Sequence, residues 1–104
     1  MDNCGMAMSF EWDDEKRDVN FSKHKVDFLF AKGIFDSFCL TKIDERQDYG
    51  EKRFVAIGTS AEIVLVVVYV ERGESIRIIS ARKAGRNERR YYREALVKRD
   101  RGHD

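Results

Sequence analysis

The sequence of 104 residues has no proline and only two cysteines and two histidines. Cys4 and Cys39 are too few and too far apart for a disulfide framework, so we expect Cys39 to be a small, buried apolar residue. His24 and His103 are equally isolated, and no Cys/His cluster has the spacing of a zinc site. We therefore expect a protein of the reducing cytoplasm that carries no metal and no other cofactor.

Long apolar runs and phosphate-binding motifs are also missing. The longest apolar run, residues 63–70, has eight residues, whereas a membrane helix needs roughly 20. The N-terminus lacks the basic and apolar regions of a signal peptide, so no membrane or secretory role is expected. The glycines are scattered and form no P-loop, and no serine lies in a nucleophile elbow. These absences argue against a P-loop nucleotide site and against an activated serine.

Charge is abundant and unevenly distributed. Apolar residues make up 42% and charged residues 38% of a chain long enough for one domain. The net charge is only +1, but residues 1–75 carry 10 basic and 15 acidic side chains, whereas residues 76–104 carry 10 and 4. Such a change of sign within one small domain suggests an edge that faces a polyanion. The alternative is a solvated basic helix whose arginines pair with the acidic half.

The hydrophobic pattern predicts an α+β fold in a single domain over residues 9–99. A disordered tail at residues 1–8 and a flexible C-terminus at residues 100–104 are expected to flank it. The expected elements are a short N-terminal strand at 9–12, two N-terminal helices at 13–25 and 28–35, an antiparallel three- to four-stranded meander at 37–43, 53–58, 63–70 and 76–81, and a C-terminal basic helix at 86–99.

Three side chains are expected to determine where the helices begin. Asp13 and Asp27 are predicted to cap the first and second helices. Gly85 precedes the last helix, and Glu88 follows three residues later, as in a capping box. Glycine has no side chain to complete that box, so the cap is expected to be weaker by a few tenths of a kcal/mol than one made by serine or threonine.

Arginine is the residue type that most suggests chemistry. Arg77 lies inside a strand of apolar residues, where a guanidinium needs a partner or a ligand. Strict alternation would place Arg77 and Arg82 on opposite faces of that strand. A structural alternative is a salt bridge from Arg77 to an acidic residue of the meander such as Glu71 or Glu74.

Further basic residues are candidates for binding phosphate, because guanidinium groups match its geometry. They are Arg53, Arg72, Lys83 and Arg86, and with Arg82 they could converge on one phosphate. His24 is a candidate general acid or base, since imidazole gains and loses a proton near neutral pH. It could equally be a charge that complements the end of its helix. Tyr49, Tyr69, Tyr91 and Tyr92 could stack on bases, although Tyr91 and Tyr92 also fit the apolar stripe of the last helix.

Several segments, in this order and spacing, resemble the BrnT family of bacterial toxins over residues 9–93. They are FEWD at 10–13, NFSKHKVDF at 20–28, DYGEKRF at 48–54, LVVVYVERG at 65–73, IRIISARKA at 76–84 and ERRYY at 88–92. The chain departs from the family at Lys25, where glycine is usual, and at Gly85, where threonine or serine is frequent.

The resemblance implies a RelE-like fold and a metal-independent endoribonuclease that inhibits translation. It also implies a cognate BrnA-like ribbon-helix-helix antitoxin, a homodimer within the complex, and contact with promoter DNA only through that complex. On this interpretation Arg77 and Arg82 hold the scissile phosphate, and His24 or Lys23 transfers protons. Arg53, Arg72, Lys83 and Arg86 bind the RNA phosphates. The alternatives are a non-catalytic ParE-like toxin that inhibits gyrase and a simple RNA-binding module.

Overall fold

The structure is a computed structural model that describes residues 9–46, 48 and 50–101. The elements in chain order are β1 (Ser9–Glu11), α1 (Asp14–His24), α2 (Phe28–Ala31), the 3-10 helix η2 (Lys32–Asp36), β2 (Cys39–Ile43), β3 (Phe54–Ser60), β4 (Ile63–Arg72), β5 (Ser75–Lys83) and α3 (Arg86–Arg101). The predicted α+β class is confirmed. The expected tail at residues 1–8 lies outside the described residues, and α3 continues two residues past the expected helix end.

The sheet has five strands in the order β1-β5-β4-β3-β2. Strands β2 to β5 form the predicted antiparallel meander, and it has four strands. The short N-terminal strand is part of the same sheet, because β1 pairs with β5 in parallel and places Phe10 opposite Ile76. The sheet is therefore mixed and five-stranded, rather than an antiparallel meander with a separate strand beside it.

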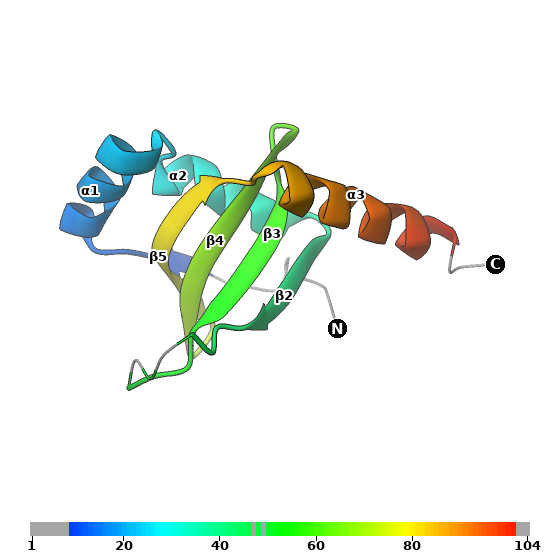
Figure 1. Cartoon of the computed structure of the whole chain (residues 1–104). Coiled ribbons are helices and arrows are strands. Elements are labelled where there is room, and N and C mark those ends of the chain that lie inside the picture. The colour runs from blue at the N-terminus through cyan, green and yellow to red at the C-terminus, as the bar shows by residue number, and fades with distance from the viewer. Residues whose placement is uncertain (1–8, 47, 49, 102–104) are drawn as a thin grey trace.

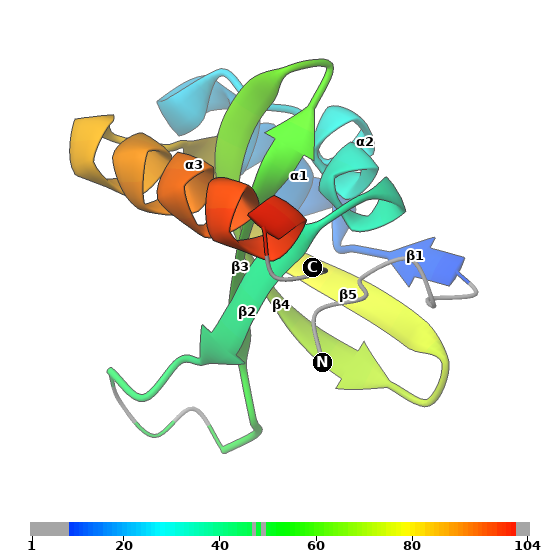
Figure 2. The same cartoon turned by 90° about the vertical axis from the view of Figure 1, so that its right-hand side faces the viewer.

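Helices cover the sheet on both faces, as Figures 1 and 2 show. On one face, Phe28, Ile34 and Phe35 from α2 and η2 pack against the sheet in the larger apolar core. On the other face, Tyr92 of α3 packs against Val64 and other residues of the strands. Strand β4 lies between the two cores, and its residues from 64 to 70 are all buried. Its apolar run is thus that of a central strand covered on both sides.

Two of the three predicted caps are present. The backbone N–H of Lys16 donates to the Asp13 carboxylate at 3.1 Å, and the Gly85 N–H donates to Glu88 at 2.8 Å, which is half of a capping box. Asp27 makes no side-chain cap. Its carboxylate instead accepts two bonds from Arg17, at 2.6 and 2.9 Å. The prediction for Asp27 was wrong because a guanidinium bound in a two-pronged pair is the stronger partner.

The second helix differs from the single buried helix expected over residues 28–35. Only one turn is α-helical, and the chain continues as the 3-10 helix η2. The Ser60 hydroxyl donates to the Phe30 carbonyl at 2.7 Å where the two join. Leu29 and Phe30 are exposed, at 52% and 37%. The apolar pattern alone did not distinguish the buried from the exposed side of this segment.

Cys39, at the start of β2, is fully buried, as expected. Its sulfur is in a disulfide bond, so the expectation that Cys39 serves only as a small apolar residue was wrong. The partner lies outside the described residues. In the part of the chain that the structure describes, no helix combines the length and the apolar character needed to cross a membrane.

Candidate functional site

A groove of about 1020 Å³ lies on the α3 side of the sheet. Helix α3 crosses the strands near one end (Figure 1). The residues that its first turns contribute to the groove are Asn87, Glu88 and Tyr91. The floor is apolar and consists of Leu40, Val55, Ile57, Val66 and Val68. The rim is polar. It comes from the end of β2 with the loop that follows, from the end of β5, from α3 and from His24 of α1.

A β-bulge in β5 decides which arginines share this face. The pairs between β4 and β5 are Val70 with Arg77, Val68 with Ser80, and Val66 with Arg82. The register shifts between Val68 and Tyr69, which leaves Ile79 as the extra residue of the bulge. Alternate residues of β4 point to the same side. Arg77 and Arg82 therefore lie on the same face of the sheet, and the prediction of opposite faces was wrong.

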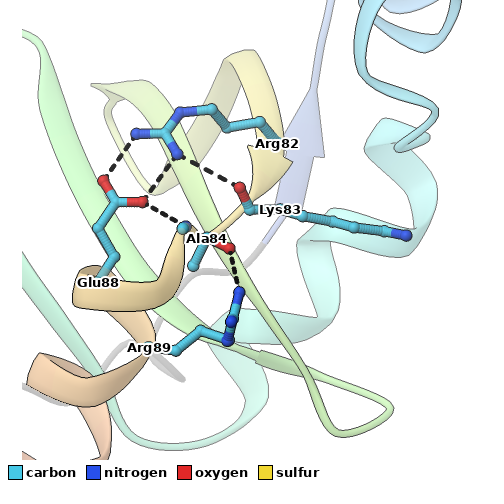
Figure 3. Close-up of polar contacts among 6 residues, drawn as sticks. Arg82, Lys83, Ala84, Glu88 and Arg89 are labelled. Carbon is cyan, nitrogen blue, oxygen red and sulfur yellow. Dashed lines mark hydrogen bonds and ion pairs between the residues drawn. The ribbon is translucent and has the colours of Figure 1, made fainter.

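Among the arginines that the sequence interpretation singled out, Arg82 is the one that lines the groove. Figure 3 shows its guanidinium facing the carboxylate of Glu88, with two bonds of 2.8 Å each. A further, longer bond of 3.3 Å reaches the carbonyl of Lys83. The side chain keeps 43% of its surface exposed. Arg82 is thus oriented from one side by Glu88 and remains open to the groove on the other.

The charge of Glu88 is fixed by the same contacts. The hydrogen bond from Arg82, with a second from the Gly85 N–H, lowers the pKa of Glu88 to about 2. The carboxylate is therefore ionised at neutral pH and is too weak a base to take a proton there. Its role in the groove is to hold Arg82 and to join it to the first turn of α3.

Asn20 explains why His24 reaches the groove and Lys23 does not. Asn20 is buried, and its side chain bonds to both backbone groups of Ala81 in β5, at 2.8 and 3.1 Å. These bonds fix the end of α1 against β5. His24, one turn further on, then lines the groove. Lys23 is exposed on the same turn and is not a lining residue.

Two cationic groove residues, Lys42 and Arg46, were missed by the sequence interpretation. Lys42 lies in β2 and Arg46 in the loop after it. The Asp44 side chain is only 1% exposed, and Arg46 donates two bonds of 2.8 Å to its carboxylate. The one signal in the sequence was the spacing of Leu40 and Lys42, which puts both on one face of a strand.

Two further candidates are paired with acids. Arg77 donates to Glu11 of β1 at 2.9 Å and is 24% exposed. The salt bridge that was the structural alternative for Arg77 is therefore present, but its acidic partner is Glu11 and not Glu71 or Glu74. Arg72 is 3.7 Å from Glu51.

The remaining predicted phosphate-binding residues do not converge on the groove. Arg53 is half-buried just before β3, and its carbonyl accepts from the Asp44 N–H at 2.7 Å. Lys83 pairs with Leu65, which belongs to the core on the other face, and its side chain points away from Arg82 (Figure 3). Arg86 lines a second, shallower groove of about 690 Å³ along α3 with Arg89, Arg90, Arg93, Glu94, Val97 and Lys98.

The described tyrosines have different environments. Tyr69 is buried between Phe35 and Phe54, and burial raises its pKa to about 12. Tyr92 is buried as well, and its hydroxyl donates to the Phe38 carbonyl at 2.8 Å. Tyr91 is 60% exposed and lines the groove, so it is not a core residue. Tyr49 lies outside the described residues.

Metal ligands do not gather in the described parts of the chain, 9–46, 48 and 50–101. Within them, no group of three or more histidine, cysteine, aspartate or glutamate side chains is placed to hold an ion. The charged groups of the groove rim are mixed: the basic side chains are Lys42, Arg46 and Arg82, and the acidic ones are Asp44, Glu45 and Glu88.

The fold and the groove together define a small α+β protein with an open groove in which Arg82 and His24 lie beside an apolar floor. The family model of the ribonuclease toxin BrnT of type II toxin-antitoxin systems matches residues 12–88. This match spans most of the chain, so the protein belongs to the BrnT family of ribonuclease toxins, and the resemblance seen in the sequence is confirmed. No curated protein matches the chain.

Proposed function

We propose that the protein is a metal-independent endoribonuclease that cuts RNA in the groove and thereby inhibits translation in the cytoplasm. The observation that carries the proposal is the groove itself, because it brings the Arg82 guanidinium and the His24 imidazole into one open groove. Membership of a ribonuclease toxin family supports RNA as the substrate.

RNA supplies its own nucleophile, the 2′-hydroxyl. In the proposed reaction His24 accepts the proton of this hydroxyl, and the 2′-oxygen attacks the adjacent phosphorus. The P–O5′ bond then breaks, the 5′-oxygen takes a proton from a water molecule, and a 2′,3′-cyclic phosphate remains. The resulting hydroxide takes the proton that His24 had accepted, which restores the imidazole. Arg82 stabilises the extra negative charge on the phosphorane oxygens, as cationic clamps do in other phosphoryl transfers.

The placement of the side chains narrows the roles predicted from the sequence. Lys42 and Arg46 are the groove cations best placed to bind the flanking phosphates. Arg77 lies on the same face, but it is held by Glu11 and is less exposed than Arg82. We assign Arg77 to a supporting role, and we prefer His24 to Lys23 for proton transfer because only His24 lines the groove.

The chain offers a matched control for each catalytic assignment. We expect His24→Ala to lower the rate of RNA cleavage at least 100-fold, and Arg82→Ala to lower it about 100-fold. Lys23→Ala and Lys83→Ala remove neighbouring positive charges that face away from the groove, and both variants are expected to cleave within a few-fold of the parent. Rates on purified, folded protein are the measurement. Equal rates for each variant and its control would refute the assignment.

The same assay separates this function from its alternatives. Cleavage that continues at full rate with a chelator and yields 2′,3′-cyclic phosphate ends supports the proposal. Loss of cleavage with the chelator would show that metal is required. Absence of cleavage together with inhibition of gyrase would favour the ParE-like toxin, and RNA binding alone would favour a simple binding module.

We further propose that a ribbon-helix-helix antitoxin of the BrnA type neutralises the toxin by covering the groove. Its acidic side chains would take the place of RNA phosphates on Arg82, Lys42 and Arg46. The complex would contain two copies of the toxin, and the antitoxin within it would bind promoter DNA. The test is to add RNA to the purified complex, where cleavage at the full rate would reject masking of the groove.

A further inference from the structure

Tyr91 is an aromatic side chain that the packing of the molecule does not require. It is 60% exposed, whereas its neighbour Tyr92 is 3% exposed and fills the core beneath α3. Exposed single aromatic residues are not unusual, but this one stands at the rim of the groove. It also lies beyond residue 88, where the match to the family model ends.

The floor of the groove beside Tyr91 is apolar and partly open. Val55 and Ile57 of β3 are only half-buried there, although both belong to an inner strand of the sheet. An apolar floor next to an exposed ring suits a ligand with a flat aromatic face, and the Arg82 guanidinium at the rim suits an anionic group on the same ligand. An unpaired RNA nucleotide has both features.

Helical geometry places Tyr91 next to the phosphate-binding side chain. Glu88, which holds Arg82, is three residues before Tyr91, so the two are neighbours on α3 about 4.5 Å apart along the helix axis. Asn87 is four residues before Tyr91 and lines the same groove. Its amide offers both a donor and an acceptor to the edge of a base.

We propose that Tyr91 stacks on the base of the nucleotide adjoining the scissile phosphate, and that Asn87 hydrogen-bonds to the edge of that base. The first turns of α3 would then decide which nucleotide is presented to Arg82 and His24. This inference rests on the proposed function insofar as the groove binds RNA. It adds a base-binding subsite and hence the origin of any base preference.

The test uses single-stranded 2′-O-methyl RNA, which lacks the nucleophile and therefore binds without being cut. We expect Tyr91→Ala to weaken its binding about 5- to 150-fold, the range found for removing one base-stacking ring. Tyr91→Phe keeps the ring and is expected to bind within about 2-fold of the parent. Val19→Ala is the matched control, because Val19 is a 55% exposed apolar residue of α1 that lines neither groove. The proposal is overturned if Tyr91→Ala binds like the parent, or if Tyr91→Phe loses as much as Tyr91→Ala.

A scan of abasic positions along the same RNA locates the base. At one position we expect removal of the base to weaken binding to the parent protein. The same removal should not weaken binding to Tyr91→Ala, because the base has then already lost the ring on which it stacks. If at every position the loss of the base and the loss of the ring weaken binding additively, stacking is contradicted.

On cleavable RNA of mixed sequence, Asn87→Ala is expected to flatten the base preference at the cut, and an unchanged preference would rule out its contact with the base edge. If the parent protein binds RNA but never cleaves it, the proposed function is refuted and the base-binding subsite is not. If the parent cleaves RNA and Tyr91→Ala cleaves it equally well, the subsite alone is refuted.

Discussion

At the scale of single residues, opposite charges in this protein position one another rather than merely cancel. Arg82 and Arg77 each face the open side of the sheet, and each is held by a carboxylate from another element, Glu88 or Glu11. A guanidinium fixed in this way loses less freedom when a phosphate arrives. The carboxylate also competes with that phosphate, so binding must be strong enough to share or displace it.

The Arg82–Glu88 pair makes a prediction about stability and pH. The pKa of Glu88 is about 2 in the folded protein, against an ordinary value of 4.5. A lowered folded-state pKa means that the stabilisation is present above about pH 4.5 and is lost as the pH falls toward 2. Both side chains are more than a third exposed, so we expect the pair to contribute only about 0.2 to 1 kcal/mol to the free energy of unfolding.

Glu88→Gln tests this contribution, because the glutamine oxygen can still accept the bond from the Gly85 N–H. Urea unfolding of the parent and the variant is the measurement, at about pH 7, 5 and 3. The parent is expected to be more stable at pH 7, with a difference that narrows on acidification. A difference independent of pH would show that the carboxylate charge does not stabilise the fold.

At the scale of elements, the packing of β3 against β2 and η2 depends on the absence of a side chain at Gly58. A Cβ atom there would lie 2.9 Å from the Cβ of Cys39 and 3.0 Å from that of Ile34. All three residues are buried, so none of them can move aside into solvent.

We therefore expect Gly58→Ala to lower the free energy of unfolding by about 1 to 3 kcal/mol, the usual cost of overpacking a core. Gly85→Ser is the control. Its Cβ would have Glu88 at 3.6 Å as its nearest neighbour, and its hydroxyl can cap α3, so it is expected to be neutral or stabilising by a few tenths of a kcal/mol. Urea denaturation of the parent and both variants measures the free energies of unfolding. Equal values for Gly58→Ala and the parent would show that the core can accommodate the extra carbon atom.

The elements that the sequence predicted well are those with a strong local signal. The meander strands were placed within a few residues, because their periodicity and the turns between them are local properties. The end of α1 closes at Lys25 with a left-handed φ of 60°, the conformation that glycine takes at this place in many helices. Lys25 therefore takes a conformation that favours the glycine usual at this position.

The features that escaped prediction depend on contacts between distant segments. Ile79, the extra residue of the bulge, is apolar like its neighbours, so no pattern marks it. The parallel pairing of β1 with β5 joins residues 66 positions apart, such as Glu11 and Arg77. These two contacts determine the face and the partner of Arg77. The sequence therefore identified Arg77 as an arginine that needs a partner, but it did not show which face Arg77 lies on or which residue binds it.

At the scale of the whole molecule, basic side chains of the groove are followed by a more strongly basic stretch along α3. Arg82, Lys42 and Arg46 line the groove, and a run of arginines that begins at Arg86 continues along the exposed side of α3. The uneven charge of the sequence thus corresponds to an arrangement in space. RNA that enters the groove can continue along α3, where each neutralised phosphate releases counterions.

This arrangement predicts how RNA binding depends on salt. For single-stranded RNA the slope of log K against log salt is about −0.7 for each phosphate neutralised. Arg86 and Arg90 are one turn apart on α3 and line the same shallow groove, so the variant with both changed to alanine should lose about 1.4 from that slope. Binding of 2′-O-methyl RNA at several salt concentrations measures it.

The control changes Lys16 and Lys23 of α1 to alanine, which removes the same charge from residues that line neither groove. Because the long-range potential falls equally in both variants, a smaller slope in the α3 variant alone identifies direct phosphate contacts. Equal slopes in the two variants would mean that α3 attracts RNA only through its overall charge. The RNA-binding surface would then end at the groove.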